Sequence, residues 1–227
     1  MYYNELHQPI GAPLPDFQAG ELPAIDLLPG RYGRLERLDP ARHGADLYQV
    51  YGPSAPAGHF TYLSIDPSPD RAHHDERLRQ MAASADPYHL AICDNNGRAL
   101  GTLALMRMDP KNRVIEVGWV CYGPALQRRR LATEAQYLLM AYVFDVLHYR
   151  RYEWKCDSLN APSRRAAERL GFTFEGIFRQ ALVYKGRNRD TAWFSLLDGE
   201  WPARRARLER WLNPENFDGA GRQLSSL

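Results

Sequence analysis

The stretch from Arg113 to Glu134, RVIEVGWVCYGPALQRRRLATE, places the strongest constraint on how this chain can fold. Its first half alternates apolar and polar residues, which is typical of a β-strand, and its second half becomes basic before an amphipathic helix begins at about Leu131. The N-terminus of a helix offers unpaired N–H groups and a partial positive charge. A strand that leads into a helix through a basic turn therefore predicts a phosphate-binding site.

The composition limits the class of protein. The chain has 227 residues, of which 44% are apolar, enough to bury the core of one domain. A net charge of +2 does not indicate a surface specialised for nucleic acids or membranes, and no stretch reaches the roughly 20 apolar residues of a membrane span. The widely spaced Cys93, Cys121 and Cys156 argue against a disulfide framework, and the histidines show no metal-ligand spacing. We therefore expect a soluble, cytoplasmic protein without a metal.

The order of elements predicts a mixed sheet covered by helices. We expect an extended, proline-rich arm at 1–24, one domain at 25–201, and a short basic helix with a tail at 202–227. The expected elements of the domain are, in order, a strand at 31–39, a helix at 40–51, a helix that starts at Ser68-Pro69, two strands around the turn Asn95-Asn96-Gly97, a strand within 113–122, a helix at 131–148, a strand at 150–158, a helix from Asn160 to Gly171, and a hairpin at 172–201.

Three segments in register carry a resemblance to a known family: QRRRLATEA at 127–135, NAPSRRAAERLGF at 160–172 and FEGIFRQ at 174–180. Over about residues 30–201 the sequence resembles the GCN5-related N-acetyltransferase (GNAT) superfamily, within it the RimJ/RimL-like branch. The resemblance implies an α/β (α+β) fold with a mixed, mostly antiparallel twisted sheet of about seven strands flanked by helices. It also implies a V-shaped splay between two central parallel strands.

The family's pyrophosphate loop has the pattern Q/R-x-x-G-x-G/A, in which Gln127 and Ala132 match while Arg130 replaces the central glycine. The resemblance implies that acetyl-CoA or another short acyl-CoA is the co-substrate. Because glycine lets the backbone approach a phosphate closely, Arg130 must point outward or supply a charge-assisted contact itself. The loop residues that would bind the coenzyme are Gln127, Arg128, Arg129, Arg130, Leu131, Ala132 and Thr133.

The resemblance further implies that the pantetheine arm lies between the strands at 114–121 and 151–158. Backbone groups near Val120 and Cys121 would then bond to the pantetheine amides or to the thioester oxygen. Asn160 and Ser163 match the family's N-x-x-S positions, at which the asparagine contacts pantetheine or the incoming amine. An ordinary helix N-cap is the alternative for Asn160, and one side chain can serve both roles.

Acyl transfer to an amine requires a deprotonated amine, a stabilised oxyanion and a protonated or solvated thiolate. Glu116 lies in the apolar run VIEVGWV, where an unpaired carboxylate is costly, so it is the candidate general base; a salt bridge to an arginine of a neighbouring strand is the alternative. Asp157 and Ser158, at the end of the next strand, are the second candidates, and Ser158 would position the amine. Tyr184 is a candidate acid, with packing as its alternative. A covalent acyl-cysteine route is disfavoured because no histidine lies close in sequence to either Cys121 or Cys156.

The leading functional hypothesis is an N-acyltransferase that moves an acetyl or other short acyl group to a primary amine of a protein N-terminus, a lysine or a small molecule. A succinyl-CoA-specific enzyme is one alternative, with Arg71, Arg77 or Arg79 as partners of the donor carboxylate. A non-catalytic acyl-CoA sensor is another, suggested by Arg130. Binding to RNA is disfavoured because the basic segments lack interleaved aromatic residues, and no membrane partner is expected. If the protein is a homodimer, the arm would close a neighbour's site.

Overall fold

The structure is a computed structural model that describes residues 1–227. Its centre is an eight-stranded sheet in the order β3-β4-β5-β6-β7-β8-β10-β9, antiparallel throughout except for the parallel pair β7 and β8. The predicted fold class is confirmed, with eight strands instead of about seven because a short β3 extends one edge. The strands are β3 (Leu27–Pro29), β4 (Gly33–Arg37), β5 (Tyr88–Asp94), β6 (Ala99–Asp109), β7 (Val114–Tyr122), β8 (Arg151–Asp157), β9 (Thr173–Tyr184) and β10 (Arg187–Leu197).

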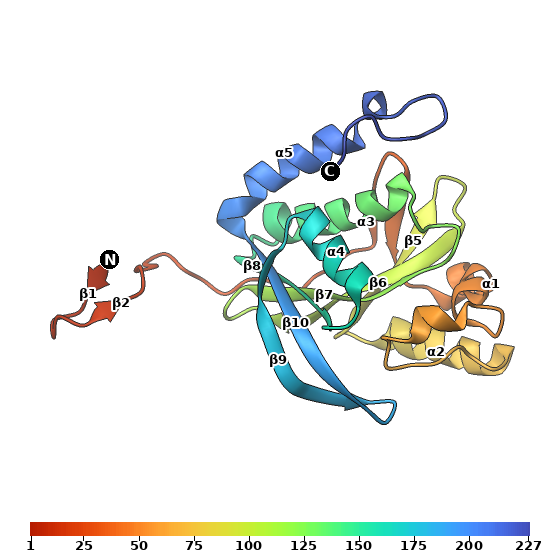
Figure 1. Cartoon of the computed structure of the whole chain (residues 1–227), viewed down its shortest axis with the longest axis horizontal. Helices are drawn as coiled ribbons and strands as arrows, with labels where there is room; N and C mark the ends of the chain where they lie inside the picture. Colours follow the sequence, from red (N-terminus) through yellow and green to blue (C-terminus); the bar gives the residue numbers. More distant parts are fainter.

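Helices cover both faces of this sheet (Figure 1). On one face lie α1 (Pro40–Tyr51) and α2 (Arg71–Ala83), and on the other lie α3 (Arg130–Ala141), α4 (Ala161–Leu170) and α5 (Trp201–Leu212). Alternating residues of β5 illustrate the division, because Leu90 contributes to the larger core below α3 and Ala91 to the smaller core below α1 and α2. Each strand in the middle of the sheet is therefore buried on both sides.

Local signals in the sequence place the helix ends. The Asp39 carboxylate accepts a hydrogen bond from the N–H of Ala41 at 2.8 Å and so caps α1. The α2 helix starts later than Ser68, because Asp70 is the residue whose side chain caps it. Gly171 ends α4 with a φ of +100°, a left-handed conformation in which glycine is favoured.

The crossover helix is shorter than expected. A regular α-helix was predicted over 131–148, but α3 ends at Ala141 and continues as a single π-helical turn, Tyr142–Val146. The Tyr142 hydroxyl accepts a hydrogen bond from the N–H of Ala24 at 3.0 Å, so this turn also fixes the segment that precedes β3. The apolar pattern could not reveal the change in helix type because the buried positions continue through it.

The two parallel strands separate halfway along their length. Their pairing runs from Val114 opposite Arg151 to Val117 opposite Trp154 and extends no further. Immediately afterwards Trp119 adopts a φ of +50°, and the register between β6 and β7 shifts at the same place. The V-shaped splay that the family resemblance implied is thus confirmed, and it leaves backbone groups of both strands without a strand partner.

The two chain ends compare differently with the predictions: the arm was expected to be irregular, whereas the basic helix expected after Trp201 is confirmed as α5. The arm contains a small hairpin of β1 (Tyr2–Tyr3) and β2 (Pro9–Ile10), which projects away from the domain in Figure 1. Contact with the domain is established at Phe17, whose ring lies 5.4 Å below the guanidinium of Arg113. At the other end, Trp201 of α5 is part of the larger core. None of the helices has both the length and the apolar character needed to cross a membrane.

Candidate active site

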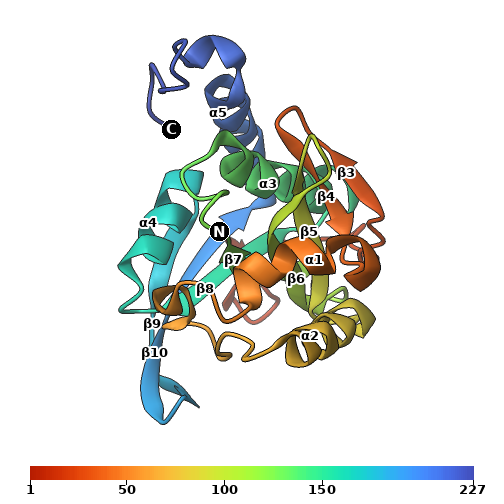
Figure 2. The ribbon, with the colours of Figure 1, turned by 90° about the vertical axis from the view of Figure 1, so that its right-hand side faces the viewer.

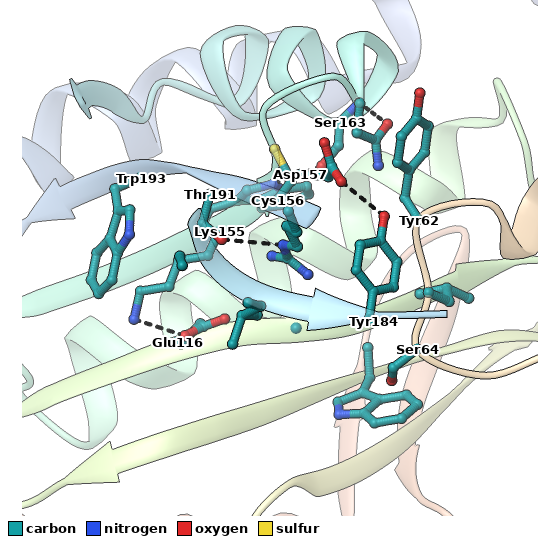
Figure 3. Close-up of a pocket in the computed structure, with 18 of the residues that line it drawn as sticks. Tyr62, Ser64, Glu116, Lys155, Cys156, Asp157, Ser163, Tyr184, Thr191 and Trp193 are labelled. Atoms are coloured by element: carbon teal, nitrogen blue, oxygen red, sulfur yellow. Dashed lines mark hydrogen bonds and ion pairs between the residues drawn. The ribbon is translucent and has the colours of Figure 1, made fainter. Parts of the chain in front are cut away.

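A cavity of about 540 Å³ opens where β7 and β8 separate. The two strands form one wall, the hairpin of β9 and β10 forms another, and Tyr62, Leu63 and Ser64 reach across from the segment between α1 and α2 (Figure 3). Fourteen of its 24 lining residues are apolar, a typical composition for a site that holds a cofactor or a small substrate. Its charged side chains are Arg107, Glu116, Lys155, Asp157 and Arg189.

Glu116 lies in this cavity, 5% exposed, on the part of β7 that is still paired with β8. Its Oε2 atom is 2.9 Å from Lys155 Nζ and 3.4 Å from Arg107 Nε. Burial raises the pKa of Glu116 above the ordinary 4.5, and the two cations offset part of that increase. The sequence offered two interpretations of Glu116, a general base and a partner in a salt bridge. The structure is compatible with both, since the carboxylate is buried at the splay and also forms an ion pair with an arginine of the neighbouring strand β6.

Lys155 is the member of this site that the sequence prediction missed. Its ammonium group is 2.7 Å from Glu153 Oε2 and 3.7 Å from the centre of the Trp193 ring, and its side chain is 7% exposed. The carboxylates of Glu116 and Glu153 and the face of the Trp193 ring therefore hold the Lys155 ammonium group in place (Figure 3). The signal was present in the sequence, because Arg151, Glu153 and Lys155 alternate along one strand and so point to one face of the sheet.

The ion pairs continue away from the cavity. Arg151 contacts Glu153 at 2.6 Å and forms a two-pronged pair with Glu175 of β9, whose Oε1 also accepts a hydrogen bond from the Ser195 hydroxyl. The pair with Arg151 lowers the pKa of Glu175 to about 2. The charges beside Glu116 are thereby anchored on three strands, which restricts the rotation of Lys155.

Tyr184 lies on the hairpin wall, and its hydroxyl donates to Asp157 Oδ2 at 2.8 Å (Figure 3). Burial and this hydrogen bond raise the pKa of the Tyr184 phenol. The other oxygen of Asp157 accepts from the N–H of Leu159 at 2.8 Å, so both carboxylate oxygens are in use. Ser158 is not among the residues that line the cavity, and the structure does not bring it together with Glu116 and Tyr184.

The cysteines near the splay are unsuited to nucleophilic chemistry. Burial raises the pKa of Cys121 to about 11 and also raises the pKa of Cys156, which lines the cavity. A thiol must ionise before it can attack a thioester, so a raised pKa works against reaction at neutral pH. The structure therefore supports direct attack by the amine over an acyl-cysteine route.

The predicted phosphate-binding turn forms the start of α3. Arg129 is the N-cap residue, and the N–H groups of Arg129 and Ala132 bond to carbonyls within the turn itself. Three other N–H groups of the predicted set find no acceptor in the chain and remain available to an anion. They belong to Arg128, Arg130 and Leu131. Gln127, at the beginning of the turn, donates from its amide to the carbonyl of Tyr122 at 3.2 Å.

Arg130 occupies the glycine position without backbone strain. It is the first residue of α3 and has a helical conformation, whereas the left-handed residue of the turn is Arg128, with a φ of +58°. Its guanidinium lies 5.0 Å from the ring centre of Tyr32 and 4.3 Å from that of Phe217. Of the two expected orientations the structure shows the outward one, with the side chain held by the C-terminal segment.

The remaining predicted contacts flank the splay. Val120, Asn160 and Ser163 line the cavity, whereas Cys121 is buried on the other side of β7. The Asn160 side chain accepts a hydrogen bond from the N–H of Ser163 at 3.2 Å and caps α4, while its NH2 group has no acceptor in the chain. The Ser163 hydroxyl accepts a hydrogen bond from Trp154 Nε1 at 2.9 Å. Asn160 thus acts as a helix cap and keeps two donors for a ligand.

The segment between α1 and α2 crosses the cavity as a strap, defined here as residues 57–66. Lys185 of the hairpin turn donates to the Phe60 carbonyl at 2.8 Å and to Asp66 at 2.7 Å, and the Tyr62 hydroxyl donates to the carbonyl of Leu159 at 3.1 Å. Both views of the ribbon show the strap beside the β9–β10 hairpin (Figure 2). The cavity is therefore covered on the side of the hairpin turn.

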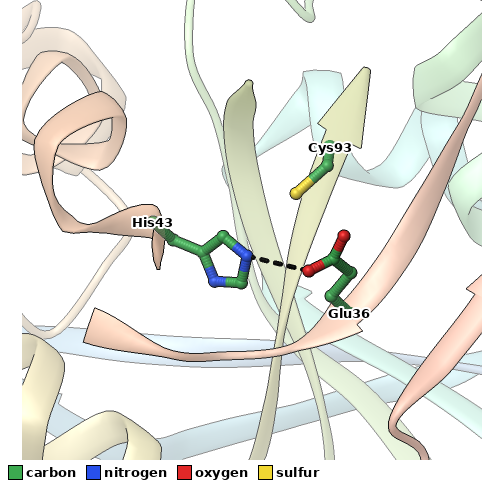
Figure 4. A group of neighbouring side chains, drawn as sticks. All are labelled: Glu36, His43 and Cys93. Carbon is green, nitrogen blue, oxygen red and sulfur yellow. Dashed lines mark hydrogen bonds and ion pairs between the residues drawn. The ribbon is translucent and has the colours of Figure 1, made fainter. Parts of the chain in front are cut away.

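A second cluster of possible metal ligands lies away from the cavity, where Glu36, His43 and Cys93 bring their ligand atoms within 4.8 Å of one another (Figure 4). The Glu36 carboxylate pairs with Arg34 at 2.5 Å and with Arg42, and His43 Nε2 is 3.2 Å from it. His43 Nδ1 accepts the N–H of Asp39, and burial raises the pKa of Cys93 to about 12. The lone pair of His43 Nδ1 is therefore in use and the Cys93 thiol stays protonated, and the contacts of Glu36 with Arg42 and His43 tie α1 to the sheet.

Comparison with known proteins places this geometry in a family. The model of the GNAT acetyltransferase domain matches residues 34–173. A crystal structure of a GCN5-related N-acetyltransferase from Brucella melitensis is 50% identical, with a TM-score of 0.91 over 94% of this chain and 97% of that one. YdaF of Bacillus subtilis, a proposed ribosomal N-acetyltransferase, is 32% identical over 47% of this chain, but the match spans only 57% of its own length.

The family match covers more than half of the chain, so the protein belongs to the GNAT acetyltransferase family. It is an acyl-CoA-dependent N-acetyltransferase by class, as the sequence predicted. The crystal structure of RimL, a ribosomal L7/L12 alpha-N-protein acetyltransferase, shares the fold with a TM-score of 0.65 at 19% identity over 76% of this chain and 94% of that one. At this identity the likeness to RimL shows the fold alone, and the assignment to the RimJ/RimL-like branch stays a prediction.

Proposed function

We propose that the protein transfers an acetyl group from acetyl-CoA to a primary amine by direct attack of the amine on the thioester. The observation that carries this proposal is the position of Glu116, a buried carboxylate at the point where β7 and β8 separate. A carboxylate there can accept a proton from an amine that lies in the cavity, either directly or through a water molecule.

The residues around the splay fit acetyl-CoA, which supplies the activated acyl group when it is bound. The free N–H groups at the start of α3 would hold its phosphates, since a helix N-terminus favours anions. The unpaired backbone of β7 near Val120 and Cys121 and the NH2 group of Asn160 would hold the pantetheine arm. The Ser163 hydroxyl accepts from Trp154 and keeps its own O–H as a donor for the pantetheine arm.

In the proposed reaction a bond forms between the amine nitrogen and the acyl carbon, and the bond from that carbon to sulfur breaks. Glu116 takes the proton that the nitrogen loses, while Lys155 keeps the carboxylate ionised until then. Tyr184, whose raised pKa keeps the phenol protonated at neutral pH, donates a proton to the departing thiolate. The phenolate then regains a proton from solvent while Glu116 releases its own, which restores both residues. Ser158 has no role in this scheme, since it does not line the cavity.

For the acceptor we propose the amino terminus of a protein, with lysine and small amines as alternatives. The names of YdaF and RimL, which refer to ribosomal and alpha-N-protein acetylation, support this choice. The cavity of about 540 Å³ has room for an amine and a few attached groups, while the remainder of a larger acceptor would stay outside the strap. We place the reaction in the cytoplasm, where acetyl-CoA and nascent protein termini occur together.

The sequence suggested two alternatives, a succinyl-CoA-specific enzyme and a non-catalytic acyl-CoA sensor, and the residues that suggested them do not support either one. None of Arg71, Arg77 and Arg79 lines the cavity, and Arg71 and Arg79 pair with acidic residues of their own helix. The sensor hypothesis rested on Arg130, which leaves the N–H groups of the turn accessible.

Release of free thiol from acetyl-CoA, followed with a panel of peptides and small amines, tests the proposal. Calorimetric binding of acetyl-CoA without turnover of any amine would favour the sensor.

We assign catalysis to residues 25–201 and place the arm at 1–24 and the segment at 202–227 outside the catalytic unit.

We propose separately that the protein forms a homodimer through the arm. The hairpin of the arm exposes Tyr2, Tyr3 and Ile10, and a hairpin this short is unstable alone in water. Size measurement before and after deletion of residues 1–16, which precede the Phe17 contact, tests it. An unchanged size would exclude the arm from the interface.

A further inference from the structure

One of the cations that line the cavity lacks an ion-pair partner. Lys155 pairs with Glu116 and Glu153, and Arg107 pairs with Glu116. Arg189 lines the same cavity, and no carboxylate of the chain forms an ion pair with it. Its guanidinium is therefore available to an anionic group that the protein does not supply.

Arg189 is held in place but is largely unused as a donor. It lies on β10 opposite Leu182 of β9, and its Nε donates to the Thr191 hydroxyl at 3.2 Å. Its guanidinium is 5.9 Å from the ring centre of Tyr184, and the residue is half-buried. Neither Nη group has an acceptor in the chain. A planar guanidinium with two free N–H edges matches the geometry of a carboxylate, which it binds through two parallel hydrogen bonds.

The polar groups that share the cavity with Arg189 do not use its Nη groups. The two oxygens of Asp157, on the strand paired with β10, accept hydrogen bonds from Tyr184 and Leu159 and none from Arg189. The Ser64 hydroxyl, which lines the cavity from the strap, makes no hydrogen bond with the chain. None of the residues 127–133 lines this cavity, so Arg189 is outside the predicted phosphate-binding turn.

We propose that Arg189 determines substrate choice by binding a carboxylate that the substrate carries. The inference rests on the proposed transferase function and narrows its substrate class. The carboxylate belongs either to the acceptor, as in a peptide whose amino terminus is followed by an acidic residue, or to the donor, as in a dicarboxylic acyl-CoA. In the first case Glu116 receives the proton of the amine while Arg189 holds the carboxylate of the same molecule.

The proposal is tested with two acceptor peptides that differ only in the second residue, Asp in one and Asn in the other. Asn is close to Asp in shape but carries no charge, so the pair isolates the effect of the carboxylate. For the wild type we expect kcat/KM with acetyl-CoA to be about 10- to 100-fold higher for the Asp peptide, the effect of one charge-assisted pair. Arg189→Met should lower kcat/KM for the Asp peptide far more than for the Asn peptide and so abolish the preference, and Arg189→Lys should restore part of it. Arg179→Met, on the exposed edge strand β9, is the matched control and should keep the preference.

Calorimetry with succinyl-CoA and acetyl-CoA examines the donor as the source of the carboxylate and does not depend on turnover. Tighter binding of succinyl-CoA that is lost in Arg189→Met would assign the carboxylate to the donor. The same calorimetry is done with the two peptides in the presence of coenzyme A. Tighter binding of the Asp peptide that is lost in Arg189→Met would assign the carboxylate to the acceptor. The proposal is overturned if neither the peptide pair nor the donor pair is distinguished by the wild type, or if Arg189→Met weakens both members of a pair equally. An enzyme that binds the Asp peptide selectively but turns over no amine would contradict the transferase function and leave the Arg189 assignment standing.

Discussion

The two halves of the candidate site bind by different means. At the start of α3 the groups available to a ligand are backbone N–H groups, so the side chains of the turn can vary and Arg130 replaces a glycine with its guanidinium turned away. At the splay between β7 and β8 the groups are side chains, and Glu116 depends on Lys155 for its charge state. Substitutions should therefore be tolerated in the first region and costly in the second.

The largest effect is expected for Glu116→Gln. Loss of the proposed base should lower kcat by about 10²- to 10⁴-fold, while the dissociation constant of acetyl-CoA changes little because the α3 turn is untouched. Steady-state kinetics together with calorimetry separates these two quantities. Glu76→Gln, an exposed carboxylate on α2, serves as the control and should behave as the wild type. A variant of Glu116 with near-normal kcat would remove it from the mechanism.

Lys155→Met should have the next largest effect, because it leaves Glu116 and Glu153 as buried carboxylates without their shared partner. Breaking a buried pair costs about 3 to 5 kcal/mol of stability. The pKa of Glu116, already raised, should rise further, so the acid limb of the pH profile of kcat/KM should move to higher pH. Lys155→Arg, which keeps the charge, should return the limb toward its original position. A pH profile unaltered by either substitution would mean that Lys155 does not act on Glu116.

A smaller loss is expected for Tyr184→Phe. Removal of the proposed acid should reduce kcat by about tenfold, which corresponds to about 1.4 kcal/mol of barrier, because the thiolate is itself a good leaving group. The hydrogen bond to Asp157 is lost as well, so thermal unfolding should be recorded beside the kinetics. Unchanged kcat with lowered stability would assign Tyr184 to packing, the alternative that its hairpin position allows.

Arg130→Gly probes the other half of the site. The dissociation constant of acetyl-CoA should change by less than about threefold, because the free N–H groups of the turn remain in place. Stability should fall by about 1 to 2 kcal/mol, from the loss of the contacts with Tyr32 and Phe217 and from glycine in the first turn of a helix. A tenfold or larger weakening of acetyl-CoA binding would show that the guanidinium turns toward the coenzyme.

The smallest effect is expected in the dependence of stability on pH. His89 packs against the Trp119 ring at 5.7 Å, and burial together with Arg37 lowers its pKa from 6.5 to about 4. The unfolded chain therefore binds a proton between these values while the folded protein does not, and stability falls as the pH is lowered from 6.5 toward 4. His89→Phe should flatten this part of the curve in urea unfolding measured at several pH values. An equal slope in both proteins would assign the pH dependence to other groups.

Most of the fold could be predicted from the sequence because its signals are local. The Asn95-Asn96-Gly97 turn, the capping residue Asp39 and the terminating Gly171 act within a few residues and place elements correctly. The π-helical turn and the arm hairpin were missed because they depend on contacts with distant residues or on very short pairings.

The site was less accessible to sequence reasoning. Glu116 was identifiable because a carboxylate in an apolar strand is unusual, and the structure brings it to the cavity with Tyr184. Lys155 was passed over although its alternation with Glu153 was readable, since the partner charge lies on another strand. Arg189 could not be singled out, because its distinguishing property is the lack of a carboxylate partner. That property becomes visible only when all neighbouring strands are placed.

The pH dependence of kcat/KM, compared between the wild type and Glu116→Gln, tests whether a buried carboxylate at the splay accepts the proton of the amine. The wild type should show an acid limb with an apparent pKa above the ordinary 4.5 of a glutamate, because burial raises the pKa of Glu116. The variant should show low activity without that limb. An acid limb at the same pH in both proteins would mean that another group titrates and that Glu116 is not the base.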